Sequence, residues 1–242
     1  MRKWIFTMRC MKEIVRDRVN LVMGFGFPVV LILLLTAIQN NIPVVQFELL
    51  SLTPAMTVFS LSFITLFTAT MVARDRETAF LQRLYTTPMT PSDFIFGYVF
   101  SVLPMALGQG IVCYLVSWIL GMKLTIGCLY AMLGLLPTSI FYICLGIVCG
   151  SALTVKQVGG ICGALLTNLS AWLSGAWFDL QLVGGVFYKI AVCLPFVHAV
   201  RLEQALFHGS WQRAIQHFGI LGVYTVVTAV GAVWLFLRQM KK

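Results

Sequence analysis

The chain has 242 residues, of which 60% are hydrophobic and 10% are charged. Soluble domains carry about 25% charged residues, so the composition excludes a water-soluble fold and indicates a protein whose surface faces lipid. The net charge of +9 does not indicate nucleic-acid binding, because the basic residues stand at the ends of apolar runs, where membrane orientation and anionic lipid account for them. The seven cysteines form no C-x-x-C pair, and their spacing suits neither a zinc site nor a disulfide framework.

Residues 1–18 predict an amphipathic helix that lies in the membrane interface. Four apolar residues recur on one face at spacings of four, three and four, and these are Trp4, Met8, Met11 and Val15. The charged residues of the other face are Arg2, Arg9, Glu13 and Arg16, with Phe6 out of place among them. A solvated basic tail is the alternative, and the Trp near the start of the segment favours the interface.

Six apolar runs follow, each long enough to cross a bilayer as a helix. They occupy residues 20–38, 52–73, 94–120, 128–153, 158–176 and 215–237. We therefore expect an all-α integral membrane protein with six transmembrane helices in a single domain over residues 19–242. With the N-terminus inside, thirteen of the seventeen Lys and Arg residues lie on the inner side, which predicts that both termini are cytoplasmic.

The turn between the second and third runs, residues 74–93, predicts a short amphipathic helix on the cytoplasmic side. The apolar side chains that share one of its faces are Phe80, Leu81, Leu84 and Tyr85. Pro88 and Pro91 end it. An apolar patch outside the lipid indicates a protein partner, and the alternative is a helix that packs on its own bundle or on the membrane surface.

This segment resembles the loop after the second span of ABC-2 type permeases, the membrane subunits of ATP-driven exporters. The residues that carry the resemblance are Asp75-Arg76-Glu77, Leu81, Leu84, Thr87-Pro88 and Gly97. The chain departs from the family pattern at Ala79-Phe80, where Gly-Thr is usual, and at Tyr98, where Lys is usual. A second stretch, Leu194-Pro195-Phe196-Val197-His198-Ala199-Val200-Arg201, is similar to the family's Pro-then-Arg stretch before the last span.

The resemblance implies that residues 74–93 contain a coupling helix, which docks in a groove of a separate ATPase (nucleotide-binding) subunit. The implied partner-binding residues are Asp75, Arg76, Glu77, Leu81, Leu84, Tyr85, Thr87 and Pro88. The apolar members would be the anchors, with the charged residues in polar contacts around them. The chain has no G-x-x-x-x-G-K-[ST] motif, so it is expected to be a transport subunit without its own ATPase site and without a cofactor, with ATP and Mg bound by the partner.

The resemblance also implies an external gate in residues 177–214, where short helices dip back into the outer leaflet. The segment is too apolar for a free loop and too interrupted for a span, and a broken backbone at that depth requires protein or a cavity around it. The predicted gate residues are Pro195, His198, Arg201 and Glu203, near the outer interface. The alternative for His198 is a capping or interfacial role.

The small polar residues of the second and fifth runs have two interpretations. The candidates for lining a central cavity are Thr57, Ser60, Thr65, Asn168 and Ser174, and residues of this kind also serve as packing contacts between helices. The layout implies a second permease subunit, identical or related, and a place in the bacterial inner membrane in contact with lipid. The expected cargo is small and amphipathic or lipid-soluble, such as a drug, a peptide antibiotic or a lipid.

Two other classes of function compete with an ATP-driven exporter. A gradient-driven carrier needs ionisable groups at the membrane midplane, and the six runs contain no Asp, Glu, Lys or Arg. An intramembrane enzyme needs a catalytic cluster at membrane depth. His198, His208 and His217 lie in or beside residues 177–214, and no carboxylate pair falls within a run.

Overall fold

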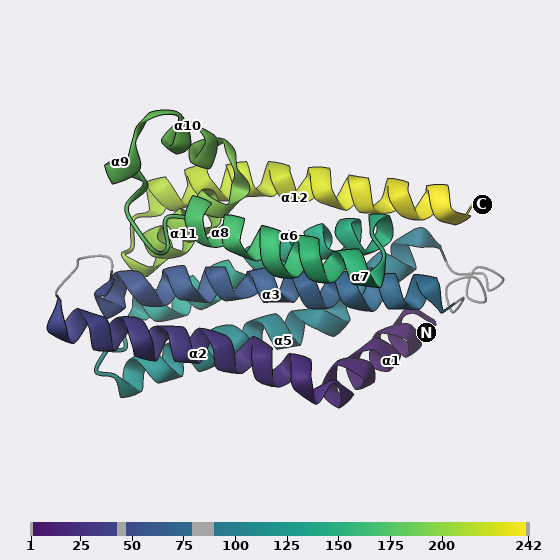
Figure 1. Ribbon diagram of the computed structural model, residues 1–242, viewed down its shortest axis with the longest axis horizontal. Coiled ribbons are helices and arrows are strands. Elements are labelled where there is room, and N and C mark those ends of the chain that lie inside the picture. The colour runs from purple at the N-terminus through teal and green to yellow at the C-terminus, as the bar shows by residue number, and fades with distance from the viewer. Residues whose placement is uncertain (1, 43–46, 79–89, 241–242) are drawn as a thin grey trace.

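The computed structural model describes residues 2–42, 47–78 and 90–240, and all regular structure within them is helical (Figure 1). The long helices are α2 (Arg18–Asn41), α3 (Leu49–Glu77), α5 (Pro91–Ile119), α6 (Ile126–Ala152) and α12 (Trp211–Met240). The shorter ones are α1 (Arg2–Arg16), α7 (Val155–Val158), the π-helix η2 (Gly159–Leu166), α8 (Thr167–Leu173), α9 (Leu180–Val183), α10 (Gly185–Cys193) and α11 (Pro195–Phe207). The prediction of an all-α membrane protein is confirmed.

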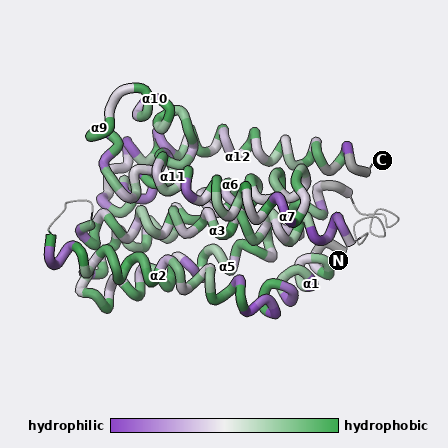
Figure 2. Tube along the Cα trace, viewed as in Figure 1, coloured by the Kyte–Doolittle hydropathy of each residue, from purple (hydrophilic) through white to green (hydrophobic). Residues whose placement is uncertain are grey.

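The five long helices are each long and apolar enough to cross a membrane, and the bent pair α10–α11 brings the number to six if it counts as one span. In α3, 83% of the most apolar stretch is buried, against 28% in α2 and 11% in α12. Helix α3 is therefore the centre of the bundle, and α2 and α12 present apolar side chains outward. Figure 2 shows hydrophobic residues along most of α2 and α12 and hydrophilic residues mainly toward the ends of the bundle.

Helices α3 and α6 form the closest packed pair because two glycines bring their backbones together. A Cβ atom at Gly146 would lie 2.7 Å from the carbonyl oxygen of Thr65, and one at Gly150 would lie 2.5 Å from that of Ala69. The Thr65 hydroxyl also donates to the carbonyl of Tyr142 at 2.8 Å. The spacing Gly-x-x-x-Gly is a known means of close helix contact in membranes, and it stabilises the core pair here.

The predicted fifth span, 158–176, is helical but not uniformly α-helical. Helix α7, η2 and α8 follow one another without a break, and the residues at both junctions keep right-handed helical dihedral angles. Within this run the Thr167 hydroxyl donates to the carbonyl of Cys162, five residues back, at 2.9 Å. Gly159, Gly160 and Gly163 weaken the α-helical preference of the run, which accounts for its wider turns.

Helix boundaries in the described chain follow recognisable caps. Asp17 separates α1 from α2, and its carboxylate accepts from the backbone N–H of Asn20 at 3.2 Å. Helix α5 begins at Pro91, and Thr90 and Asp93 form a capping box around it. Pro at the first helical position and a reciprocal side-chain cap are both strong start signals.

The two ends of the bundle differ in content. Figure 1 places both chain termini at one end, together with α1, the end of α3 and the start of α5, and we call this the N–C end. The opposite end, which we call the far end, carries α9, α10 and α11. Helices α10 and α11 meet at a bend of 76°, the geometry of a broken span or a re-entrant loop. Short helices thus occupy the segment 177–214, in which the sequence predicts an external gate.

Candidate functional site

The polar cluster at the N–C end is built on the last turn of α3. Residues Arg74 to Glu77 continue the helix of the second span, whereas the sequence analysis assigns them to the separate segment 74–93. The predicted amphipathic helix and its residues Leu81, Leu84, Tyr85, Thr87 and Pro88 lie outside the described residues. What the structure describes is the base from which that segment leaves the bundle.

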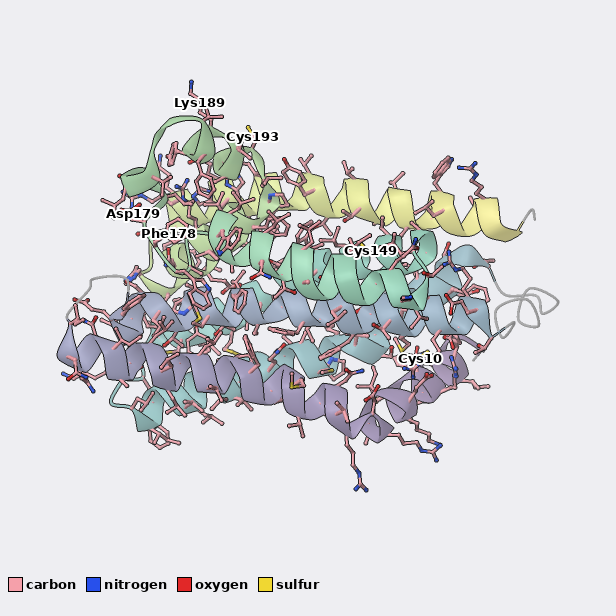
Figure 3. The ribbon with its side chains drawn as sticks, viewed as in Figure 1. Cys10, Cys149, Phe178, Asp179, Lys189 and Cys193 are labelled. Atoms are coloured by element: carbon pink, nitrogen blue, oxygen red, sulfur yellow. The ribbon has the colours of Figure 1, made fainter. Side chains whose placement is uncertain are left out.

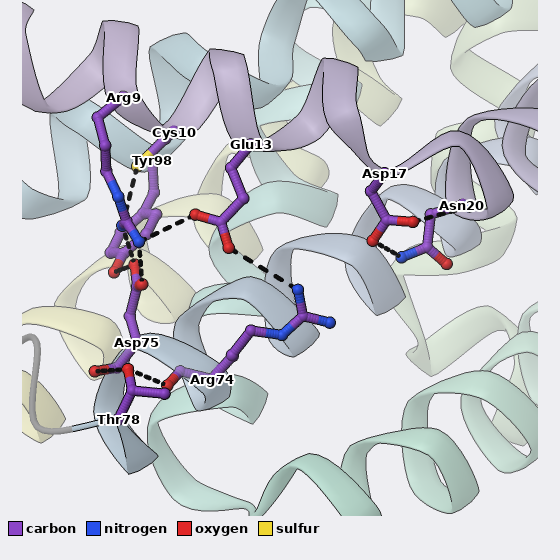
Figure 4. A network of polar contacts seen from close by, with 9 residues as sticks. All are labelled: Arg9, Cys10, Glu13, Asp17, Asn20, Arg74, Asp75, Thr78 and Tyr98. Carbon is purple, nitrogen blue, oxygen red and sulfur yellow. Dashed lines mark hydrogen bonds and ion pairs between the residues drawn. The ribbon is translucent and has the colours of Figure 1, made fainter.

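Asp75 is the centre of this cluster, with 1% of its surface exposed. Both of its carboxylate oxygens accept from the guanidinium of Arg9 at 2.7 Å, and the Tyr98 hydroxyl donates to one of them at 2.8 Å (Figure 4). Glu13, one turn after Arg9, accepts from it at 3.0 Å and lies 3.8 Å from Arg74. A bidentate Arg–carboxylate pair fixes direction as well as distance, so α1, α3 and α5 are held in one arrangement.

Close packing reinforces this polar contact between α1 and α5. Phe6, the residue that is out of place in the predicted amphipathic pattern, is buried and lies edge-on to the rings of Phe94 and Tyr98. A Cβ atom at Gly97 would lie 2.2 Å from the ring of Phe6. Gly97 therefore makes room for α1, and Tyr98, at the family's usual Lys position, places its hydroxyl on Asp75.

The other face of α1 corresponds to the predicted lipid-facing side. Trp4, Met8 and Val15 are all exposed, in agreement with the apolar face predicted for an interfacial helix. Two apolar surfaces therefore coexist on α1, since Phe6 and Cys10 are buried against the bundle. The position of α1 in a membrane interface stays a prediction.

Arg76 and Glu77 hold the turn between α6 and α7. The Arg76 guanidinium donates to the backbone carbonyls of Ser151 and Leu153, where a helix C-terminus attracts cations. The Glu77 carboxylate accepts from the backbone N–H of Val155 at 2.9 Å, at the start of α7. Three consecutive residues of α3 thus connect it to four neighbouring helices.

These contacts correct part of the predicted partner-binding set. Asp75 faces α1 and α5 instead of an outer surface, because its buried carboxylate requires the Arg9 charge. Arg76 is partly buried on the subunit's own carbonyls, and only Glu77 is exposed. The sequence analysis did not identify Arg9 and Glu13 as partners of this cluster, although their i, i+4 spacing is a signal of pairing on one helix face.

Burial and charge act together on the ionisable groups of α1. Burial opposes the charge of Arg9, yet the hydrogen bond and charge of Asp75 outweigh it and raise the pKa of Arg9 above its ordinary value. Burial raises the pKa of Glu13, Asp75 adds to that rise, and Arg9 opposes it. Burial raises the pKa of the Cys10 thiol to about 12, so this thiol is protonated and unreactive while α1 is docked.

The predicted gate residues all lie on α11 at the far end. Pro195 opens the helix, and His198 is buried, with its Nε2 2.9 Å from the carbonyl of Val192 and its Nδ1 3.0 Å from Nδ1 of His217. His198 therefore joins α10, α11 and α12, and its contact with the Val192 carbonyl, in the last turn of α10, is of the capping kind. Arg201 is partly exposed.

Glu203 departs from the prediction of a residue near the outer interface. It is completely buried, and its Oε1 accepts from the hydroxyl of Thr138 at 3.2 Å while its Oε2 has no hydrogen-bond partner. Thr138 stands twelve residues after Ile126, the first residue of α6, about 18 Å along the helix at 1.5 Å per residue. Helix α11 thus inserts a carboxyl group into the bundle, and the lack of acidic residues in the six runs no longer argues against a gradient-driven carrier.

The predicted cavity residues divide into two groups. Thr57, Ser60 and Thr65 are buried; the first two donate to backbone carbonyls of their own helix α3, and Thr65 donates to α6, a contact of the kind that the packing alternative describes. Asn168 is exposed and donates to its own helix. Ser174 is buried but lines a cavity of about 180 Å³, so the described cavity that it reaches is at the far end and not at the centre of the bundle.

Among the described residues no group of three His, Cys, Asp or Glu is placed to hold a metal ion.

Comparison with known proteins identifies the family of the chain. No curated protein matches the chain. The family model described as ABC-2 type transporter matches residues 3–207, a range that contains the α3 cluster, Gly97 and all of α11. The chain therefore belongs to the ABC-2 type transporter family and is a membrane permease subunit of an ABC transporter.

Proposed function

We propose that this subunit belongs to an exporter that moves a small amphipathic or lipid-soluble cargo out of the cytoplasm or the inner leaflet. ATP hydrolysis on a separate nucleotide-binding subunit supplies the energy, and that subunit docks at the N–C end through residues 79–89 and Glu77. In this proposal the N–C end is cytoplasmic, which agrees with the distribution of Lys and Arg. The observation that carries the proposal is the last turn of α3, which connects four helices immediately before residues 79–89.

The geometry supports transmission of movement from that end into the bundle. Asp75 connects the turn to α1 and α5, and Arg76 and Glu77 connect it to α6 and α7. The core of α3 is the most buried of the long helices, and close-packed interiors transmit strain because they have little free volume. A displacement at residues 79–89 therefore moves several helices together instead of bending one.

The complete transporter in this proposal contains a second permease subunit, as a homodimer or with a related chain. The ABC-2 membrane domain in general lacks an ATPase site, so ATP and Mg belong to the partner subunit. Exposed apolar side chains on α2 and α12 include Val22, Leu34, Val223 and Trp234. These faces suit contact with lipid or with a second subunit. The proposed location of the subunit is the bacterial cytoplasmic (inner) membrane.

A gradient-driven carrier is the second candidate, and the buried carboxyl of Glu203 is the observation that favours it. An ionisable group inside a membrane bundle is a common element of proton pathways. The discriminating measurement is cargo movement after the proton gradient has been collapsed with ATP intact. Transport that continues supports the exporter, and transport that stops supports the carrier.

The test of the coupling proposal is a charge reversal at Glu77 in the assembled complex. The chain is purified together with its ATPase subunit, and ATP hydrolysis and cargo movement are measured in the same vesicles. Glu77→Arg is expected to separate hydrolysis from transport by at least about 10-fold, since it removes a charge-assisted contact and introduces repulsion. Glu77→Gln is the matched control, because its amide oxygen still accepts from the Val155 N–H. Unchanged hydrolysis and transport in Glu77→Arg would contradict the assignment.

A further inference from the structure

The far end contains an open cavity of about 480 Å³ where α11 meets α12. Helix α11 contributes Arg201 and Gln204 to its wall, the connection after it contributes His208 and Ser210, and the start of α12 contributes Arg213 and His217. Ser51, Gln181 and Tyr188 complete the polar lining from α3, α9 and α10. Segments far apart in the sequence therefore meet around one polar hollow.

The charge of this wall is of one sign. Arg201 and Arg213 have no ion-pair partner among the residues that the structure describes, and no Asp or Glu is part of the wall. Asp179 lines the adjoining cavity of about 180 Å³, where its carboxylate accepts from the N–H of Gln181 at 2.9 Å. Two unpaired guanidinium groups beside hydroxyl and amide donors form a suitable environment for an anion.

Helical spacing explains why these side chains converge. On α11, residues 201 and 204 stand at i and i+3, and on α12 residues 213 and 217 stand at i and i+4, while His208 and Ser210 lie in the short connection between the two helices. Such residues share one helix face. The first turn of the 30-residue helix α12 lies beside this face, and the positive end of its helix dipole adds a partial charge there.

The geometry of the two histidines adds a further polar atom. The carbonyl of Val192 can only accept, so His198 carries a proton on Nε2. Nδ1 of His198 is then the acceptor, and Nδ1 of His217 donates to it at 3.0 Å. Nε2 of His217 takes no part in this contact. His217 is part of the cavity wall, and because its Nδ1 carries the proton in this tautomer, its Nε2 can only accept a hydrogen bond, so the donors to an anion are the other wall residues.

Aromatic side chains indicate the depth of the cavity in the membrane. Trp211 follows Ser210 directly, is 50% exposed and lies edge-on to Tyr130 at 4.8 Å between ring centroids. Tyr188 belongs to the wall itself. Trp and Tyr gather at the level of the lipid headgroups, which is also the level of lipid phosphates.

We propose that this cavity binds the oxyanion group of an anionic amphiphile, such as a phosphate, at the outer headgroup level. Arg201 and Arg213 supply the charge, and Gln204, Ser210 and His208 supply hydrogen bonds. The proposal goes beyond the exporter function and does not depend on it. The oxyanion has two sources, a membrane lipid or a free anion, and the test separates them.

The test measures binding to the full-length chain in a neutral detergent. The probes are dihexanoyl phosphatidylglycerol, dihexanoyl phosphatidylcholine and inorganic phosphate, and native mass spectrometry gives the dissociation constants. Phosphatidylglycerol is expected to bind at least about 10-fold more tightly than phosphatidylcholine, since the latter has no net charge. Preference for phosphatidylglycerol over inorganic phosphate identifies the amphiphile as the source, and equal affinity identifies the free anion.

The variants make the test specific to this cavity. Arg201→Gln with Arg213→Gln is expected to weaken phosphatidylglycerol binding at least about 10-fold. The matched control is Lys123→Gln with Lys189→Gln, which removes the same charge from exposed residues at the same end; Figure 3 shows Lys189 directed away from the bundle. If the Arg pair is poorly folded, Arg213→Gln alone, at an exposed position, should weaken binding about 3-fold or more. Unchanged binding in the Arg variants, or equal loss in the Lys control, would overturn the proposal.

Discussion

At the residue scale, the packing of Phe6 on Gly97 decides whether α1 stays on the bundle. Gly97 is one of the motif residues behind the family resemblance, and the structure gives its physical reason, since any Cβ there meets the Phe6 ring. Two of the contacts in this region cannot be predicted from a short sequence motif. Phe6 lies 91 positions before Gly97 in the numbering, and Asp75 finds its charge partner on α1 and its hydroxyl partner on α5.

Substitution of Gly97 by Ala is expected to displace α1 and expose Cys10. Because the pKa of Cys10 is raised to about 12 by burial, release toward an ordinary thiol pKa should raise its maleimide labelling rate at pH 7.5 by roughly 10-fold or more. Labelling is read by peptide mass spectrometry in a Cys193→Ser background. Gly108→Ala is the control on the same helix, because a Cβ there meets Phe25 at an ordinary 3.5 Å. Equal Cys10 labelling in both variants would argue against the Phe6–Gly97 contact.

At the element scale, hydropathy predicted the described long helices and their approximate ends, because each must satisfy its own backbone hydrogen bonds in lipid. The predictions 94–120 and 128–153 correspond to α5 and α6 within three residues. Other features depend on tertiary contact and could not be predicted from hydropathy. Glu203 lies in a segment too interrupted for a span, where its carboxyl is expected near the membrane surface, yet α11 directs that carboxyl into the bundle. The Gly146-x-x-x-Gly150 spacing was a usable signal that the sequence analysis passed over.

The α3–α6 contact predicts a position-dependent effect of one methyl group. Gly150→Ala forces the carbonyl of Ala69 to move, and overpacking of this kind costs about 1–3 kcal/mol. Gly222→Ala on α12 has nothing within 4 Å and is expected to be neutral or to stabilise by up to about 1 kcal/mol, since Ala favours the helix. Thermal unfolding of the purified chain in detergent measures both. Equal midpoints for the two variants would contradict the close packing of α3 on α6.

At the scale of the whole molecule, the arrangement of the helices places both termini at one end and the short helices α9, α10 and α11 at the other. This agrees with an even number of crossings and with the charge distribution along the sequence. The family resemblance rests on motifs in residues 74–97 and 194–201, and residues 79–89, in which a coupling helix is predicted, lie outside the described structure. The structure shows how the last turn of α3, just before that segment, contacts the neighbouring helices. These contacts join residues far apart in the sequence, so residue spacing could not predict them.

The proposed orientation predicts which cysteine is accessible from outside the cell. Cys193 is exposed on α10 at the far end and points outward in Figure 3, whereas Cys10 is buried at the N–C end. A membrane-impermeant maleimide applied to intact cells should label the protein, and Cys193→Ser should abolish that labelling. Labelling of Cys193 only after the cells are opened would reverse the proposed orientation.

The last turn of α3 also limits the way in which this helix can move. Successive residues of an α-helix point about 100° apart, so the contacts of Asp75, Arg76 and Glu77 occupy roughly 200° of the helix circumference. A rotation of α3 about its own axis would break all three contacts at once, while a tilt that carries α1, α5 and α6 along breaks none. The end of α3 has therefore lost its rotational degree of freedom, and a force applied at residues 79–89 enters the bundle as tilt and not as twist.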